Sequence, residues 1–313
     1  MTWRVLVSAP KFLSILEGFR TRLEEEGVEI VAVPVRERLS EAELLEVVAS
    51  IDGAICGDDE FTEKVLRAAG RLKVISKWGT GIDSIDTGAA AKLGIRVCNT
   101  PNAFTDAVAD TTLGYILSFS RGLHEMDRDV HRGLWAKPDL LALKECTLGV
   151  VGMGNIGKSV VRRARAFGMR VVGADPMALD SSFVLETGIV MMPLRQLLVE
   201  ADFVSLHCDL NPTSFHLIGR AELSVMKSSA YLINTARGPV VDETALVDAL
   251  HTKQIAGAAL DVFEVEPLPI DSPLREFSNC LLATHNANSS GDAHRRVHES
   301  TIENLLTGLR EAR

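Results

Sequence analysis

Short runs of valine, isoleucine and leucine alternate with amphipathic segments of helix length along almost the whole chain. The apolar runs are nearly continuous, which is typical of parallel strands that are buried on both faces of a sheet. Two parallel neighbours need a crossover connection, and this connection is usually a helix. The pattern therefore predicts an α/β protein with parallel sheets.

The first third of the chain has the pattern of one compact sheet, with helices expected between strands at residues 41–49 and 85–93. Its strands are expected at Val5–Ser8, Val28–Val33, Gly53–Cys56, Leu72–Ser76 and Arg96–Cys98. Thr100-Pro101-Asn102 interrupts this rhythm, because the residue before a proline is disfavoured in a helix. A long helical segment is expected at residues 105–121 and would lead into a second domain.

A second series of strands begins at residue 147 and predicts a second sheet. Its strands are expected at Thr147–Gly152, Val171–Ala174, Phe203–His207, Ala230–Asn234, Gly257–Asp261 and Leu281–Ala283. Residues 289–313 have the pattern of one closing helix. We therefore expect two Rossmann-like domains, each a doubly wound parallel sheet, with a cleft between them. Residues 1–99 plus 289–313 would form one domain, and residues 100–288 the other.

Composition supports two domains and excludes several classes of partner. The 313 residues are 46% hydrophobic, which is enough for two cores. The formal net charge is −9 and no basic run is dense, so we expect neither nucleic acid nor a membrane surface as a partner. No apolar stretch has the length of a membrane span or a signal segment, which predicts a cytoplasmic protein. The five cysteines form no C-x-x-C pair, so we expect reduced thiols and no metal site.

The sequence Gly152-Met153-Gly154-Asn155-Ile156-Gly157 connects an expected strand to an expected helix at residues 158–167. This is the dinucleotide-binding pattern G-x-G-x-x-G in its required context. Gly152 permits the tight turn, Gly154 lets the backbone approach a pyrophosphate, and Gly157 lets the helix pack against the strand. The amides at the start of the helix would then face the phosphates.

A carboxylate ends the next expected strand, where Asp175-Pro176 follows Val171–Ala174. At this spacing from the glycines, Asp175 can accept hydrogen bonds from both adenosine ribose hydroxyls and would repel a 2′-phosphate. NAD is therefore the expected cofactor, in preference to NADP. The alternative is that Asp175 only caps the following helix and that the glycines only form a turn.

Three further segments place charged or titratable residues after expected strands, at the edge where open α/β sheets bind ligands. They are residues 231–238 with Arg237, residues 259–269 with Asp261 and Glu266, and residues 281–285 with His285. Together with residues 77–86, 99–101 and 107–110, these segments resemble the D-isomer-specific 2-hydroxyacid dehydrogenases. The resemblance covers nearly the whole chain and is closest to short phosphoglycerate dehydrogenase-like members without a regulatory tail domain.

This resemblance implies an NAD-dependent oxidoreductase that transfers a hydride between nicotinamide and C2 of a small D-2-hydroxy or 2-keto acid. Residues 100–288 would form the NAD-binding domain, and residues 1–99 plus 289–313 the substrate-binding domain. The partner would be a small anionic acid.

The resemblance also implies a catalytic group of Arg237, Glu266 and His285. Arginine can hold a carboxylate through two hydrogen bonds while its charge polarises the neighbouring ketone. Imidazole titrates near neutral pH, so His285 can donate a proton as the hydride arrives. Glu266 would pair with His285 and favour its charged form. Taken alone, Arg237 could be an ion-pair partner and His285 a structural residue, so these roles depend on the combined motifs.

The remaining site residues and a homodimer follow from the same resemblance. The substrate would bind at Lys77, Trp78, Gly79, Thr80, Gly81 and Arg237. The cofactor would contact Gly152, Gly154, Asn155, Ile156, Gly157, Asp175, Pro176, His207, Thr235, Ala236, Asp261 and His285. His207 is expected to be structural or adjacent to the cofactor, and Trp78 and Trp135 to be packing residues. The apolar surplus of the helix at residues 105–121 predicts a two-fold dimer contact.

Departures from the family pattern leave the substrate open. Phosphoglycerate dehydrogenases usually carry an arginine where Gly57 stands, and three acids, Asp58, Asp59 and Glu60, follow it here. These acids would disfavour a phosphate if they face the substrate, although a charge run more often faces solvent. Glycerate-, phosphoglycerate- and phosphonate-like acids are all candidates.

A protein of a different class is the alternative to an enzyme: an NAD(H)-sensing regulatory protein that resembles the corepressors of this superfamily. Formate-type oxidation fits poorly, because those relatives carry a glutamine in place of Glu266.

Overall fold

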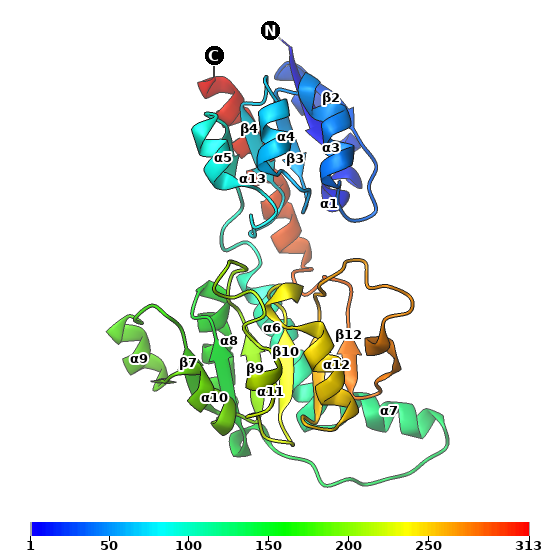
Figure 1. The fold of residues 1–313 in the computed structure, drawn as a ribbon, viewed down its shortest axis with the longest axis vertical. Coiled ribbons are helices and arrows are strands. Elements are labelled where there is room, and N and C mark those ends of the chain that lie inside the picture. Colours follow the sequence, from blue (N-terminus) through cyan, green and yellow to red (C-terminus); the bar gives the residue numbers. More distant parts are fainter. Residues whose placement is uncertain (1, 313) are drawn as a thin grey trace. The chain divides into compact units, whose positions relative to one another are not determined.

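The computed structural model describes residues 2–312, and the chain forms two compact units. Unit 1 comprises Met1–Phe104 and Ser290–Arg313, and unit 2 comprises Thr105–Ser289. Both ends of the chain therefore belong to unit 1 (Figure 1). Each unit contains one parallel sheet, so the predicted α/β class with two Rossmann-like sheets is confirmed.

Unit 1 is built on a five-stranded parallel sheet with the strand order β2-β1-β3-β4-β5. Its strands are β1 (Trp3–Val7), β2 (Val28–Ala32), β3 (Gly53–Cys56), β4 (Val74–Lys77) and β5 (Arg96–Cys98). Its helices are α1 (Pro10–Leu13), α2 (Glu17–Glu25), α3 (Glu41–Val47), α4 (Glu63–Ala68), α5 (Thr87–Lys92) and α13 (Gly291–Glu311), with a 3-10 turn η1 (Val48–Ser50). In the centre of the sheet, Gly53 pairs with Val5 on one side and with Val74 on the other.

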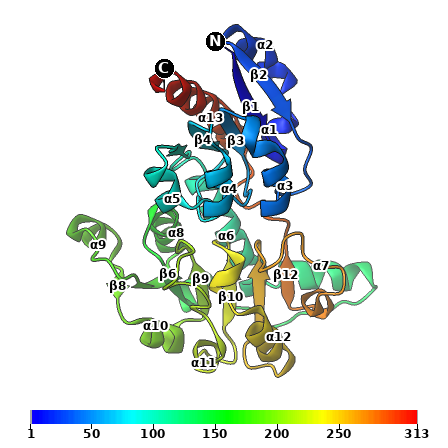
Figure 2. The same cartoon turned by 45° about the horizontal axis from the view of Figure 1, so that its top comes forward.

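Helices cover both faces of the unit 1 sheet (Figure 2). On one face, α13 packs against β3, β4 and β5, and the Ser76 hydroxyl donates a hydrogen bond to the Thr301 carbonyl at 2.8 Å. On the other face, α3, α4 and α5 enclose a buried apolar core. The helix α13 begins two residues after the predicted start, because the Ser290 side chain accepts a hydrogen bond from the amide of Ala293 and caps the first turn.

Unit 2 is built on a seven-stranded parallel sheet with the strand order β12-β11-β10-β9-β6-β7-β8. Its strands are β6 (Thr147–Val151), β7 (Arg170–Ala174), β8 (Val190–Met191), β9 (Phe203–Leu206), β10 (Tyr231–Asn234), β11 (Gly257–Leu260) and β12 (Cys280–Leu282). Its helices are α6 (Thr105–Ser120), α7 (Leu123–His131), α8 (Asn155–Ala166), α9 (Ser181–Thr187), α10 (Leu194–Glu200), α11 (Arg220–Leu223) and α12 (Glu243–His251). Three 3-10 turns complete it: η2 (Leu143–Glu145), η3 (Gly238–Val240) and η4 (Pro273–Glu276).

The strand order of unit 2 indicates where a ligand can bind. From β6 the sheet extends through β7 to β8, and the chain then returns to β9 on the other side of β6 and continues to β12. The change of direction lies between β6 and β9, and ligands of open α/β sheets bind at the carboxyl ends of the strands at such a point. Helices α6 and α8 pack on one face of this sheet, and α10, α11 and α12 on the other.

The strand β8 and the helix α7 of unit 2 are not among the predicted elements. The edge strand β8 has only two residues, which is too short for a hydrophobic pattern, and α7 has no buried residue to mark its inner face. Trp135, expected to be a packing residue, is 80% exposed in the segment after α7. That prediction is wrong because the segment leaves the core. The same prediction for Trp78 is confirmed, since it is 7% exposed.

The helices and the cysteines bear on the expected environment of the chain. Within residues 2–312, no helix combines the length and the apolar character needed to cross a membrane. All five cysteines are free, and Cys56, Cys146 and Cys280 are buried, as expected of small core residues. The cytoplasmic location stays a prediction.

Candidate active site

The glycine pattern forms the loop between β6 and α8, at the carboxyl edge of the unit 2 sheet. Gly152 has φ +93°, and a Cβ there would lie 2.6 Å from the His207 carbonyl carbon. A Cβ on Gly157 would lie 2.0 Å from the Gly152 carbonyl oxygen, whereas nothing lies within 4 Å of the Cβ position of Gly154. The loop therefore presents open backbone at the start of α8, which fits a pyrophosphate.

Asp175 follows β7 and contacts the glycine loop directly. Its Oδ2 accepts a hydrogen bond from the Met153 amide at 2.6 Å, and its Oδ1 accepts one from the Met177 amide at 2.8 Å. Each carboxylate oxygen can accept a second hydrogen bond. The carboxylate thus holds the loop and still has capacity for two ribose hydroxyls. The neighbouring Pro176 is exposed.

His207 follows β9, the strand next to β6, and supports the sheet edge. Its amide donates to the Val151 carbonyl at 2.7 Å, and its Nε2 shares a 2.8 Å hydrogen bond with the Ser205 hydroxyl. Burial lowers the pKa of His207 to about 3, so its ring is neutral at physiological pH. The backbone of His207 lies against the glycine loop, while its side chain lies within the sheet edge.

The turn after β10 carries Arg237 and is held by Asn234, a residue that the sequence analysis did not single out. The Asn234 Oδ1 accepts from the Ala236 amide at 3.0 Å, and its Nδ2 donates to the Arg237 carbonyl at 2.8 Å. An asparagine directly after an apolar strand is a recognisable turn signal. The Arg237 guanidinium donates to the Ala236 carbonyl at 2.9 Å, and the Thr235 hydroxyl contacts that of Thr112 in α6 at 3.2 Å.

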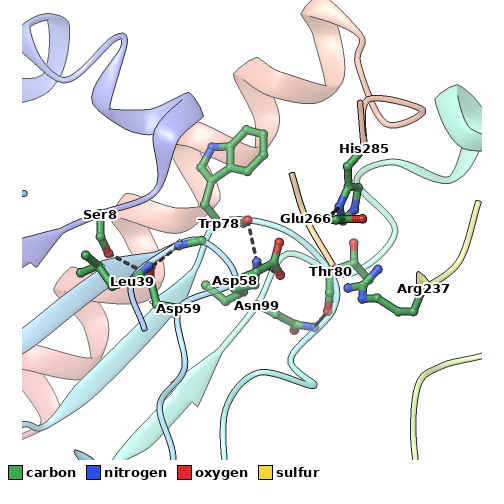
Figure 3. A network of polar contacts seen from close by, with 12 residues as sticks. Ser8, Leu39, Asp58, Asp59, Trp78, Thr80, Asn99, Arg237, Glu266 and His285 are labelled. Carbon is green, nitrogen blue, oxygen red and sulfur yellow. Dashed lines mark hydrogen bonds and ion pairs between the residues drawn. The ribbon is translucent and has the colours of Figure 1, made fainter. Parts of the chain in front are cut away.

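His285 and Glu266 lie side by side at the same carboxyl edge (Figure 3). The Nδ1 of His285 and the Oε2 of Glu266 are 2.8 Å apart, and both side chains are largely buried. The second oxygen of Glu266 accepts the Phe263 amide at 2.9 Å, which fixes the carboxylate on its own loop. A carboxylate on Nδ1 orients the ring and selects Nε2 as the nitrogen that exchanges a proton with a ligand.

Asp261 fixes the backbone around His285. It is 2% exposed, and its carboxylate accepts the amides of Asn286 at 3.0 Å and Ala287 at 2.8 Å. Its carbonyl accepts the His285 amide at 2.7 Å. The family resemblance places Asp261 at the nicotinamide, and the structure adds that both of its carboxylate oxygens hold the turn after β12.

Gly238 joins the loop of Arg237 to the loop of Glu266. A Cβ on Gly238 would lie 1.9 Å from both the carbonyl carbon and the carbonyl oxygen of Phe263, so the two backbones touch. Further out, the Glu243 amide donates to the Glu264 carboxylate at 3.1 Å, and the Glu264 amide donates back to the Glu243 carboxylate. Three of the loops after the strands of unit 2 are therefore fastened into one support for Arg237, Glu266 and His285.

The predicted substrate loop, residues 78–81, follows β4 in unit 1. The Trp78 amide donates to the Cys56 carbonyl at 2.8 Å, and Gly79 has φ +129°. The Gly79 carbonyl accepts the Thr100 amide at 2.9 Å, and the Thr80 hydroxyl donates to the Thr100 carbonyl at 3.1 Å. The loop is therefore bound on both sides within unit 1.

The three acids after β3 are all engaged within unit 1. Asp58 lies 3.0 Å from the ammonium of Lys77, whose side chain is only 5% exposed. Asp59 is fully buried and accepts hydrogen bonds from the Ser8 hydroxyl at 2.5 Å and the Leu39 amide at 2.6 Å. Burial raises the pKa of Asp59, and these hydrogen bonds oppose the rise. Glu60 lies 3.4 Å from Arg38. The expectation that such a charge run faces solvent is wrong for Asp59.

The glycine loop, the carboxylate after β7 and the histidine–glutamate pair together define a dinucleotide-dependent oxidoreductase that moves a proton with the hydride. Comparison with known proteins identifies the family. Residues 113–287 match the family model described as "D-isomer specific 2-hydroxyacid dehydrogenase, NAD binding domain". This chain belongs to the D-isomer specific 2-hydroxyacid dehydrogenases and is an NAD-dependent enzyme, as predicted.

Its relatives act on several small acids. The chain is 42% identical to glyoxylate reductase of Korarchaeum cryptofilum (strain OPF8), over 79% of this chain and 76% of that protein. It is 36% identical to D-3-phosphoglycerate dehydrogenase of Methanocaldococcus jannaschii, over 92% of this chain and 56% of that protein. The structure of D-lactate dehydrogenase from Aquifex aeolicus complexed with NAD and lactic acid superposes with a TM-score of 0.86 and 28% identity, over 96% of this chain and 93% of that chain.

Proposed function

We propose that this enzyme reduces a small 2-keto acid without a phosphate group, such as glyoxylate or hydroxypyruvate, and oxidises the corresponding D-2-hydroxy acid in the reverse direction. The observation that carries the proposal is the 2.8 Å contact between His285 Nδ1 and Glu266 Oε2, at the sheet edge that also bears the glycine loop. That arrangement supplies a proton where a ketone oxygen gains charge. The similarity to a glyoxylate reductase supports a short substrate.

The residues divide the reaction between them. Bound NADH supplies a hydride to the ketone carbon. Arg237 binds the substrate carboxylate through two hydrogen bonds and draws electron density from the ketone. His285 donates the proton on Nε2 to the ketone oxygen, and Glu266 stabilises the charged ring and keeps it in place. In the oxidative direction, neutral His285 accepts the hydroxyl proton.

The side chains of unit 1 support a substrate without a phosphate group. Gly57 offers no side chain to a phosphate, and a Cβ there would lie 3.3 Å from the ring of Pro10. Lys77 would be the nearest cation to the proposed substrate loop, but Asp58 offsets its charge at 3.0 Å. The backbone amides of residues 79–81 are the proposed donors to the substrate carboxylate.

A substrate panel tests the function. NADH oxidation would be followed at about 340 nm, a property of the cofactor, with glyoxylate, hydroxypyruvate, phosphohydroxypyruvate, 2-ketoglutarate and phosphonopyruvate, and with NADPH as control. We expect the highest kcat/KM with glyoxylate or hydroxypyruvate and NADH. A clear preference for a phosphorylated or phosphonylated acid would contradict the proposed substrate class. Binding of NADH without turnover of any acid would favour the NAD(H)-sensing regulatory role instead.

The role of His285 has its own test. His285→Ala should lower kcat by about 100-fold or more, the size expected for loss of general acid catalysis. The Kd for NADH, measured by protein-to-cofactor fluorescence transfer, should stay within about twofold, because the glycine loop and Asp175 are unchanged. An equal loss of cofactor affinity would show that His285 supports the fold of the site and not the proton transfer.

We further propose that the enzyme is a homodimer. The apolar residues of α6 that suggested this, including Ala109, Leu113 and Phe119, are buried within unit 2. A group of exposed apolar residues lies instead on α7 and the segment up to residue 141, which we call the arm. They are Leu123, Val130, Leu134, Trp135 and Leu141, each more than half exposed. A second copy of the chain is the proposed partner of the arm.

A further inference from the structure

Two histidines of α13 lie against the residue that opens the proposed substrate loop. The indole Nε1 of Trp78 donates a hydrogen bond to Nδ1 of His298 at 3.0 Å. The centroid of the indole ring lies 5.7 Å from that of His298 and 5.5 Å from that of His294, one turn earlier on α13. The centroid of the Phe104 ring lies 5.7 Å from that of the indole and 6.4 Å from that of His294. Trp78 is thus held by one directional bond within an aromatic cage.

The position of the indole is coupled to the backbone that follows it. Figure 3 shows the ring of Trp78 directed away from Thr80 and Asn99, while its own backbone leads into the loop. The Trp78 amide is fixed to β3, and Gly79 and Thr80 are bound to Thr100. A shift of the indole would act first on Gly79, the next residue, which is held through its carbonyl by Thr100 and carries an amide proposed to bind the substrate carboxylate.

We propose that His298 is a positioning residue for the substrate loop: its neutral ring holds the Trp78 indole, and protonation of that ring weakens binding of the 2-keto acid but not of NADH. An indole N–H can only donate, and Nδ1 can accept only while it carries no proton. A charged His298 would present two N–H groups and lose this bond. The inference rests on the proposed function, because it takes residues 78–81 as the site of the substrate carboxylate.

The surroundings of His298 determine the pH range in which the bond exists. Burial lowers the pKa of His298, the neighbouring His294 lowers it further, and Glu299 opposes these effects. Glu299 is itself paired with Arg22 of α2 at 2.5 Å. Burial and Lys11 of α1 lower the pKa of His294.

The other neighbours of His298 are apolar rings, Phe12 at 5.9 Å and Phe19 at 6.3 Å. A pKa below the ordinary histidine value means that the neutral ring and its bond are present at neutral pH. Both are lost as the pH falls through the lowered value.

A pair of variants separates this role from simple packing. In His298→Asn, the side-chain oxygen occupies the place of Nδ1 and does not titrate, whereas His298→Leu removes the acceptor. For the wild type, KM for the keto acid should stay constant down to about pH 6.5, the ordinary histidine value, and rise only at lower pH, because the pKa of His298 is lowered. His298→Asn should keep a KM close to the wild-type value and lose this rise. His298→Leu should raise KM about fivefold at neutral pH, the size expected for one neutral hydrogen bond. This difference from the wild type should shrink as the pH falls and the wild type loses the same bond.

Further measurements distinguish a positioning role of His298 from a role in cofactor binding or in proton transfer. The KM for NADH should not change in either variant, and kcat should follow the same pH profile as the wild type. His251→Asn, at an exposed position of α12 in unit 2, is the control for removal of a histidine. An unchanged KM in His298→Leu, or the same acid rise of KM in His298→Asn as in the wild type, would overturn the proposal.

A spectroscopic titration of the wild type tests the bond directly. The chain has only three tryptophans, so ¹⁵N-labelled tryptophan gives three indole signals, which Trp3→Phe and Trp135→Phe assign. The Trp78 signal should shift as the pH falls, and in His298→Asn it should not. A Trp78 signal that does not respond to pH would overturn the proposal even if a variant failed to fold. Turnover with no effect of His298 refutes this inference alone, whereas NADH binding without turnover of any keto acid refutes the proposed function.

Discussion

At the scale of single residues, the carboxylates of the candidate site each make two polar contacts, at least one of them with the backbone. Asp175 and Glu266 each hold the backbone of their own region while facing a proposed ligand or His285. Asp261 holds the turn after β12 with both oxygens. Each such group is pre-oriented by the protein, which reduces the reorganisation needed when ligands bind.

The carboxylate of Asp175 should decide which cofactor is used. In Asp175→Asn, one side-chain oxygen can still accept the Met153 amide, but the negative charge that repels a 2′-phosphate is gone. We expect the preference for NADH over NADPH, measured as the ratio of kcat/KM, to fall about tenfold or more. The control is Asp180→Asn at the exposed cap of α9, which should leave the ratio unchanged. An undiminished preference would mean that other residues exclude the phosphate.

His207 should make folding sensitive to acid. Its pKa is about 3 in the folded protein, well below the ordinary value, so between pH 6.5 and 3 only the unfolded chain takes up the proton. This contribution to stability is complete above pH 6.5 and falls as the pH falls. In His207→Gln, whose amide can still reach Ser205, the free energy of unfolding should lose roughly 2 kcal/mol less than the wild type between pH 7.5 and 5.

Urea denaturation followed by circular dichroism at several pH values measures this difference. His251→Gln, in which an exposed histidine is removed, should keep the acid sensitivity of the wild type. Parallel curves for His207→Gln and the wild type would contradict the buried neutral state of His207.

The sequence could predict the chemical types at the site but not all of their supports. The glycines, Arg237, Glu266 and His285 stand in recognisable local patterns after apolar runs. Asn234 holds a local turn, with partners two and three residues further on, and an asparagine directly after an apolar strand is a signal that could have found it. Asp59 acts through hydrogen bonds whose partners are 20 and 51 residues away in sequence. Whether an acid is buried or solvated is decided by such distant partners.

At the scale of elements, the backbone contact between Gly238 and Phe263 should be indispensable. Gly238→Ala would place a methyl group 1.9 Å from backbone atoms that cannot rotate away. Separation of the two loops should lower kcat/KM by about 100-fold, because Arg237 and Glu266 would move apart from each other. It should also destabilise the protein by about 1–3 kcal/mol, as overpacking does.

Steady-state kinetics and thermal denaturation check both effects. The matched control is Gly291→Ala in the first turn of α13, where nothing lies within 4 Å of the Cβ position. It should leave kcat/KM and stability nearly unchanged. Wild-type kinetics in Gly238→Ala would show that the two loops adjust independently.

Helices and strands with a strong hydrophobic periodicity could be predicted from the sequence. Two expected strands, Gly53–Cys56 and Arg96–Cys98, match the structure to the residue, and most others shift by one or two residues. The last helix was also predictable, because α13 buries one face along its length and has a serine cap. Helix α7 buries none of its residues, although Leu123, Met126 and Val130 recur at helical spacing, and the sequence analysis did not single it out.

At the scale of the whole molecule, the arm should control assembly. In both views, α7 extends away from the sheet of unit 2 (Figure 1 and Figure 2). Sedimentation at micromolar concentration should give twice the mass of the 33.9 kDa chain. The double variant Val130→Glu/Trp135→Glu should sediment as a monomer, because each substitution would bury an unpaired charge in an apolar contact.

The control for the arm is Leu185→Glu on α9, which changes an 89% exposed residue of the same unit. It should leave the dimer intact. A wild-type monomer at micromolar concentration would refute the dimer. Dissociation of the control variant would show that the dimer contact does not lie on the arm alone.

The place of α13 has a consequence for how the protein is made. This helix covers β3, β4 and β5 of unit 1, yet the ribosome adds it only after all of unit 2, residues 105–289, has been synthesised. The strands of unit 1 are therefore translated long before the helix that shields one of their faces. Domains tend to fold as they leave the ribosome. Unit 2 can therefore complete its fold while one apolar face of the unit 1 sheet is still uncovered. The two units therefore complete their folds in the reverse of the order in which their synthesis begins.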